Sequence, residues 1–126
     1  MSDSEKWLTK AARLDEEAEA LDAQATRMLE KQAAISPPET GLSDTFSWQA
    51  GLHEGYADQH DLEARAARLR ANAAEARARS SFVSATRALE RQVGAVEMLE
   101  ADAYAAQAKA ERAQAKVARA RAALYG

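Results

Sequence analysis

The chain is 126 residues long and carries a net charge of −3, from 20 acidic and 17 basic side chains. It has no cysteine, which excludes a disulfide framework, a thiol nucleophile and a thiolate metal site. Alanine occupies 33 positions, and alanine favours helix while contributing little buried area. The composition therefore predicts one all-α domain, 1–126, built from elongated helices rather than around a compact core.

The first predicted helix covers residues 3–35. Ser2 and Glu5 have the spacing of a capping box, in which two side chains satisfy backbone amides at a helix start. From Trp7 to Ile35, residues that are apolar at every position but Gln32 then follow in alternating steps of four and three. This is the heptad seam of a coiled coil, and it predicts one face that packs on another helix.

A loop over residues 36–43 follows, because Pro37 and Pro38 lack amide donors and disfavour helix before them. Ser43 or Asp44 is the expected N-cap of the next helix. Residues 44–81 form that second helix.

Residues 82–124 form either a third helix or the continuation of the second. One seam runs from Trp48 to Val83 and another from Phe82 to Leu124, in different registers. The apolar face therefore changes direction near residues 80–84. Four large side chains are expected to anchor helix packing: Trp7, Trp48, Leu52 and Phe82.

Two architectures explain the change of register. One long helix over 44–124 would give an elongated helical hairpin, which we favour because residues 80–84 contain neither Gly nor Pro. A turn at 80–84 would instead give a three-helix, coiled-coil-like bundle, in keeping with the comparable lengths of the three segments.

The long helix would reach ~120 Å, against ~50 Å for the first helix at 1.5 Å per residue. We therefore expect another chain to cover the seam that the first helix cannot reach. The residues of this predicted oligomer seam are Val96, Leu99, Ala103, Ala106, Ala110, Ala113, Val117 and Leu124.

Both histidines lie in the segment 47–61, but they do not predict a metal site. His53 and His60 are seven residues apart, about 10.5 Å along a helix, which is too far for one zinc ion. Glu54, Asp58 and Asp61 share one helix face, where a solvated acidic surface is the common interpretation. We predict no catalytic residue, no metal site and no cofactor.

The run Trp48-Gln49-Ala50-Gly51 after a first helix resembles the small secreted helical hairpins of the WXG family. That motif has one residue between Trp and Gly, whereas this chain has two. The tyrosines at 56, 104 and 125 also lack the acidic residue four positions later that the family's secretion tail requires. The resemblance implies a secreted hairpin with a paired partner, and covers only hairpin shape and one tryptophan.

Charge is distributed unevenly along the chain. Residues 1–61 have 13 acidic and 5 basic side chains, whereas residues 62–126 have 7 and 12. Because the two halves carry opposite net charges, they favour pairing between helices of one chain or of two copies. The basic residues near the C-terminus also form a stripe of candidate phosphate contacts: Lys109, Arg112, Lys116 and Arg119.

These patterns favour a non-enzymatic structural or assembly protein, a coiled-coil subunit of an oligomer with itself or another helical subunit. A phage or virion component is the expected setting. The alternative is a nucleic-acid-binding or regulatory coiled coil that uses residues 65–121. A secreted WXG-like hairpin is a further alternative.

The sequence shows neither a signal peptide nor an apolar run long enough for a membrane span, for which about 18 residues are needed. We therefore expect the protein in the cytoplasm or in a virion, with no membrane partner.

Overall fold

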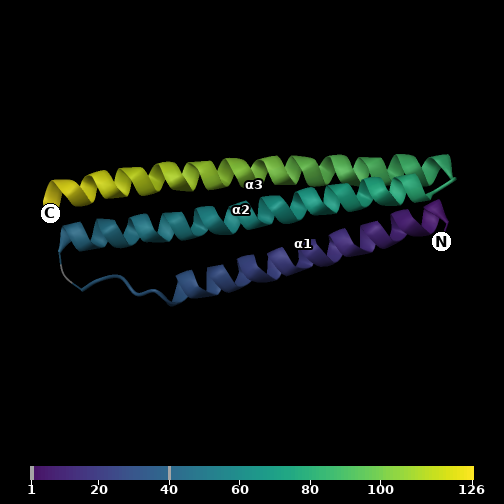
Figure 1. Cartoon of the computed structure of the whole chain (residues 1–126). Helices are drawn as coiled ribbons and strands as arrows, with labels where there is room; N and C mark the ends of the chain where they lie inside the picture. Colours follow the sequence, from purple (N-terminus) through teal and green to yellow (C-terminus); the bar gives the residue numbers. More distant parts are fainter. Residues whose placement is uncertain (1, 40) are drawn as a thin grey trace.

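The structure is a computed structural model that describes residues 2–39 and 41–126, and all its regular elements in these ranges are helices. Helix α1 spans Asp3–Ala34, α2 spans Leu42–Ser80 and α3 spans Ser84–Tyr125. Consecutive helices run antiparallel beside each other (Figure 1). The all-α prediction is therefore confirmed. Residues 1 and 40, the second of which belongs to the predicted loop, lie outside the described ranges.

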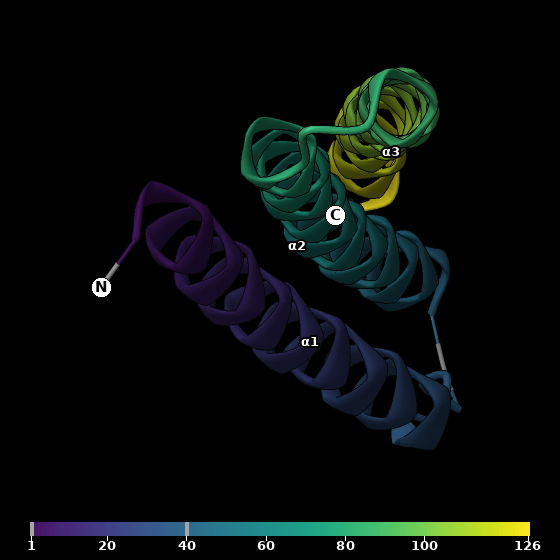
Figure 2. The same ribbon diagram turned by 90° about the vertical axis from the view of Figure 1, so that its right-hand side faces the viewer.

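The three helices form a layer one helix thick rather than a closed bundle. Helix α2 packs on α1 and on α3, whereas α1 and α3 make no close contact within the described residues. The end-on view shows α2 between the two others (Figure 2). Each outer helix therefore has one covered face and one face turned away from the rest of the chain.

Helix α1 begins and packs as its sequence predicts. The Ser2 hydroxyl accepts a hydrogen bond from the Glu5 amide at 3.2 Å, and the Glu5 carboxylate accepts one from the Ser2 amide at 3.4 Å. On the predicted seam, Ala11, Leu14, Ala18 and Ala25 are buried. The heptad pattern therefore correctly identifies the face of α1 that packs on α2.

Helix α2 begins at Leu42, two residues before the predicted start. Gly41 is its N-cap with φ 83°, a left-handed conformation that glycine adopts without strain. The prediction that Ser43 or Asp44 caps this helix is wrong, because both lie inside its first turn. The Ser43 hydroxyl instead donates to the Ala122 carbonyl at 3.0 Å and so joins the start of α2 to the end of α3.

The continuous helix that we favoured over 44–124 is wrong, because the chain turns back between Ser80 and Ser84. Ser81 and Val83 adopt extended conformations, with φ −98° and −92°. Serine hydroxyls take part in the turn: Ser80 donates to the Arg77 carbonyl at 2.7 Å, and the Ser81 hydroxyl accepts from the Val83 amide at 3.1 Å. An extended turn of this kind requires neither glycine nor proline.

The four predicted packing anchors differ in burial. Trp7 packs against the cluster of Ala11, Leu14, Ala73 and Ala76, and its ring lies 5.0 Å from the Arg79 guanidinium. Trp48 and Leu52 are half-buried on α2. The prediction for the fourth anchor, Phe82, is wrong. This ring lies in the turn and is 91% exposed.

Helix α2 uses two faces with different side chains. The predicted seam from Trp48 through Leu62 and Leu69 to Ser80 runs along the α1 side, where the Ser4 hydroxyl donates to the Ser80 carbonyl at 2.7 Å. The α3 side carries a buried alanine in every heptad: Ala50, Ala57, Ala64, Ala71 and Ala78. Helix α3 presents buried alanines with the same repeat: Ala101, Ala108, Ala115 and Ala122. Methyl groups alone separate the two backbones there, so these helices can approach closely.

Candidate interaction surface

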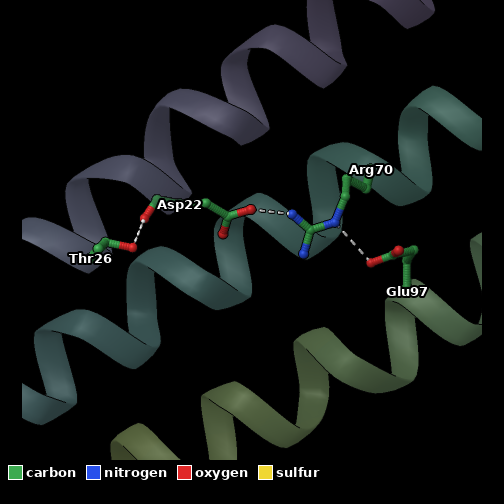
Figure 3. Close-up of polar contacts among 4 residues, drawn as sticks. All are labelled: Asp22, Thr26, Arg70 and Glu97. Atoms are coloured by element: carbon green, nitrogen blue, oxygen red, sulfur yellow. Dashed lines mark hydrogen bonds and ion pairs between the residues drawn. The ribbon is translucent and has the colours of Figure 1, made fainter. Parts of the chain in front are cut away.

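Two arginines of α2 join all three helices. Arg70 donates from Nη1 to Asp22 of α1 at 2.6 Å and from Nε to Glu97 of α3 at 3.1 Å (Figure 3). Burial lowers the pKa of Arg70, but the hydrogen bonds and charges of Glu97 and Asp22 outweigh it and leave the pKa raised. The bridge fixes the relative positions of two helices that do not contact each other.

The same bridge recurs one heptad away. Arg77 donates to Asp15 at 2.7 Å and to Glu90 at 3.2 Å. All three members of each bridge are displaced by seven residues, in the directions that antiparallel helices require. The repeated ion pairs therefore fix the register of the layer.

Both histidines lie on the α3 side of α2. His53 Nδ1 lies 2.5 Å from a carboxylate oxygen of Glu111, and the His60 ring stacks on Tyr104 with centroids 6.3 Å apart. His60 Nδ1 is also 3.3 Å from Glu63. Each histidine has its own carboxylate, and the described residues contain no group of three side chains that could hold a metal ion. The histidine segment therefore belongs to helix packing.

The predicted basic stripe faces the acidic side of α2 for part of its length. Arg112 pairs with Asp58 at 3.3 Å and with Asp61, whereas Arg119 pairs with Glu54 at 2.7 Å. The hydrogen bond that Arg112 donates to Asp61 is the main reason that the pKa of Arg112 is raised. The structure thus brings together the acidic and basic groups that the sequence singled out separately.

The other two stripe residues, Lys109 and Lys116, are exposed and form no ion pair with any described residue. Only half of the candidate phosphate contacts are therefore free of intramolecular carboxylates.

The predicted oligomer seam lies on the face of α3 that points away from α2. All eight residues of this outer seam are exposed in the single chain, Leu99 to 69% and Leu124 to 79%. Leu89 extends the seam by one heptad toward the turn and is also exposed. The length argument for this seam is wrong, because the long helix on which it rested does not exist and α3 folds back on α2. The seam residues are exposed for another reason, which is that α3 packs on α2 through its row of alanines.

The opposite edge of the layer has a different character. The α1 positions that point away from α2 are exposed and largely polar: Thr9, Ala12, Glu16, Glu19, Ala23, Thr26 and Glu30. Among the described residues, the continuous apolar row therefore lies on the α3 edge, whereas the exposed Leu8 and Leu29 of α1 are far apart along their helix.

No protein-family model matches this chain, and none of the curated proteins or solved structures with which it was compared does so either. None of the helices in the described ranges combines the length and the hydropathy that crossing a bilayer requires.

Proposed function

We propose that the protein is a non-enzymatic structural or assembly protein, a helical subunit that associates through the outer seam of α3. The supporting observation is the long apolar stripe on one edge of the layer. A monomer seldom exposes so continuous an apolar surface, because its contact with water is unfavourable. We place this subunit in the cytoplasm or in a virion, with a phage particle as one such setting.

The internal structure fits this role better than it fits catalysis. The buried side chains are alanines and two leucines, and no polar or charged residue of the described ranges is fully buried. General acid–base chemistry needs a perturbed group in a concave site. Here the raised pKa values of Arg70 and Arg77 and the lowered pKa of Glu75 belong to partly exposed ion pairs.

Native mass measurement tests the proposal. The wild-type chain should form an oligomer, and Leu99→Asp/Val117→Asp should dissociate it because two carboxylates would enter the apolar contact. A matched control, Leu8→Asp/Leu29→Asp, alters two exposed leucines of α1 and should leave the mass unchanged. Equal helical circular dichroism for all variants would show that the fold is retained. A monomeric wild type would refute the proposal.

The nucleic-acid alternative has Lys109 and Lys116 in its favour, since both are exposed and outside the internal ion pairs. Arg112 and Arg119 count against it, because phosphate would have to displace Asp58, Asp61 and Glu54. Salt-dependent binding of duplex DNA or RNA that falls after Lys109→Ala/Lys116→Ala would favour the alternative.

A further inference from the structure

We propose that the outer seam docks on the outer seam of a second copy of this chain, with the two α3 helices antiparallel and overlapping along their full length. This inference rests on the proposed function and adds the partner, the orientation and the register. It is carried by the repeat of the seam, by the sizes of its side chains and by the charges beside it.

Helix α3 has two apolar faces with one common repeat. The buried positions Ala101 and Ala108 recur every seven residues, and so do the exposed positions Ala103 and Ala110. Two residues correspond to about 200° around a helix, so the two rows lie on nearly opposite sides. Helix α2 already follows the inner row over the length of α3. A second helix can follow the outer row by the same coiled-coil geometry.

The side chains of the seam complement themselves in the antiparallel direction. When two copies of Ser84–Tyr125 are placed side by side, antiparallel and fully overlapping, Ala103 of one chain faces Ala106 of the other. Large residues then face alanines of the second copy: Leu89 faces Ala120, Val96 faces Ala113, Leu99 faces Ala110 and Leu124 faces Ala85. Alternating large and small residues keep the distance between the helices even. Val117 alone meets a polar residue, Gln92.

The flanking charges favour this register. It places Asp102 beside Lys109 of the second copy, and the two-fold axis creates this pair twice. Both side chains are exposed, and neither forms an ion pair within its own chain among the described residues. A shift of one heptad in one direction would bring the two copies of Asp102 together, and likewise the two copies of Glu100. A shift of one heptad in the other direction would bring the two copies of Lys109 together. Such like-charge contacts disfavour both shifted registers.

A parallel arrangement is less favourable on three grounds. It would place Lys116 beside Arg121 of the second copy, twice. It would stack Leu99 on Leu99 while Ala103 faced Ala103, which requires an uneven helix spacing. It would also align the two helix dipoles, whereas antiparallel helices oppose them.

The position of α3 leaves room for this partner. Helix α3 forms one edge of the layer, and α1 does not reach it. Because the contact is isologous, it closes at two copies, and the largely polar outer face of α1 offers no continuous apolar row for a third among the described residues. The product is a continuous six-helix layer with the two α3 helices at its centre.

Cysteine cross-linking tests the orientation, since the natural chain contains no cysteine. An equimolar mixture of the Val96→Cys and Ala113→Cys variants should form a disulfide-linked dimer under mild oxidation. Each variant alone should not, because the two copies of residue 96 would lie about 25 Å apart along the axis, and those of residue 113 likewise. Efficient self-cross-linking of Val96→Cys would indicate parallel helices and overturn the inference.

Charge reversal tests the register. Asp102→Lys would turn two attractive pairs into two repulsive ones and should raise the dimer dissociation constant about tenfold at low salt, given the small energies of exposed pairs. Adding Lys109→Asp restores opposite charges and should recover the wild-type value. The inference fails if the double variant is no tighter than Asp102→Lys alone.

The outcomes separate this inference from the proposed function. A monomeric wild type would refute both. An oligomer that Leu99→Asp/Val117→Asp dissociates, but that cross-links in the parallel pattern or has a mass above two chains, would preserve the proposed function and overturn the antiparallel dimer.

Discussion

The side-chain amide of Gln32 on α1 lies over Gly55 of α2, in the space that a β-carbon at position 55 would occupy. A Cβ built on Gly55 would be 1.9 Å from the Gln32 nitrogen. Gly55 is therefore the point of close approach between α1 and α2. Gly51, one turn earlier, has nothing within 4 Å of such an atom.

Replacement of Gly55 by alanine should reveal this contact. Alanine favours a helix interior over glycine by about 1 kcal/mol, but the new methyl group must displace Gln32. We expect Gly55→Ala to change the unfolding free energy little in the wild type and to stabilise the Gln32→Ala variant by about 1 kcal/mol. Urea denaturation of the wild type, the two single variants and the double variant measures the coupling energy between residues 32 and 55. An equal gain in both backgrounds would contradict it.

The alanine contact between α2 and α3 should not tolerate a larger side chain. Ala108 is buried on the inner row of α3, whereas Ala12 is exposed on the outer face of α1. Ala108→Leu should lower the unfolding free energy by about 1–3 kcal/mol, because the helices would have to separate. Ala12→Leu, the matched control, should stay within about 0.5 kcal/mol of wild type. Similar melting temperatures for the two variants would argue against close packing.

Loss of a bridging arginine should destabilise the layer modestly and in a salt-dependent way. Arg70→Met removes the contacts to Asp22 and Glu97, both partly exposed, and we expect a loss of about 1 kcal/mol. Arg68→Met is the control, since Arg68 is exposed and forms no ion pair with a described residue. The difference in unfolding free energy between Arg70→Met and wild type should shrink in 1 M salt, where the Debye length is about 3 Å. An equal loss of unfolding free energy in Arg68→Met would show that the bridge does not stabilise the layer.

Alkaline pH should weaken the fold through Tyr104. Burial, together with the charges of Glu63 and Glu100, raises the pKa of Tyr104 above its ordinary value of 10.0. A raised folded-state pKa means that the stabilisation is complete below the unfolded pKa and is lost as the pH rises through the folded one. Melting temperatures should therefore fall less steeply for Tyr104→Phe than for wild type above about pH 10. Tyr125→Phe, at the exposed end of α3, provides the comparison, and identical pH profiles for Tyr104→Phe and wild type would contradict the assignment.

The sequence predicted those features that depend on the repeat of apolar residues. The seam of α1 and the seam of α2 from Trp48 to Ser80 identify the faces in contact, because burial of an apolar stripe is the main force that pairs helices. The exposure of the outer seam of α3 did not follow in this way, because it was argued from a continuous helix that the turn after Ser80 rules out. The capping box at Ser2 and Glu5 followed from local chemistry alone.

Two features could not be predicted in the same way. The turn after Ser80 lacks glycine and proline, and its extended residues are supported by serine hydroxyls, for which the run Ser80, Ser81 and Ser84 was the only local signal. The inner row of α3 was missed because its members are alanines. In a chain with alanine at 33 positions, small residues do not mark a face unless the partner helix is known.

The absence of contact between α1 and α3 affects how the chain can fold. Helices α2 and α3 are joined by three residues and form a hairpin whose contacts do not involve α1. Helix α1 gains its packing only from a face of α2 that this hairpin already presents, and it detaches without breaking any helix contact between α2 and α3. The layer can therefore open at one edge in a sub-global step, in which the α1 amides exchange with solvent while the hairpin stays protected.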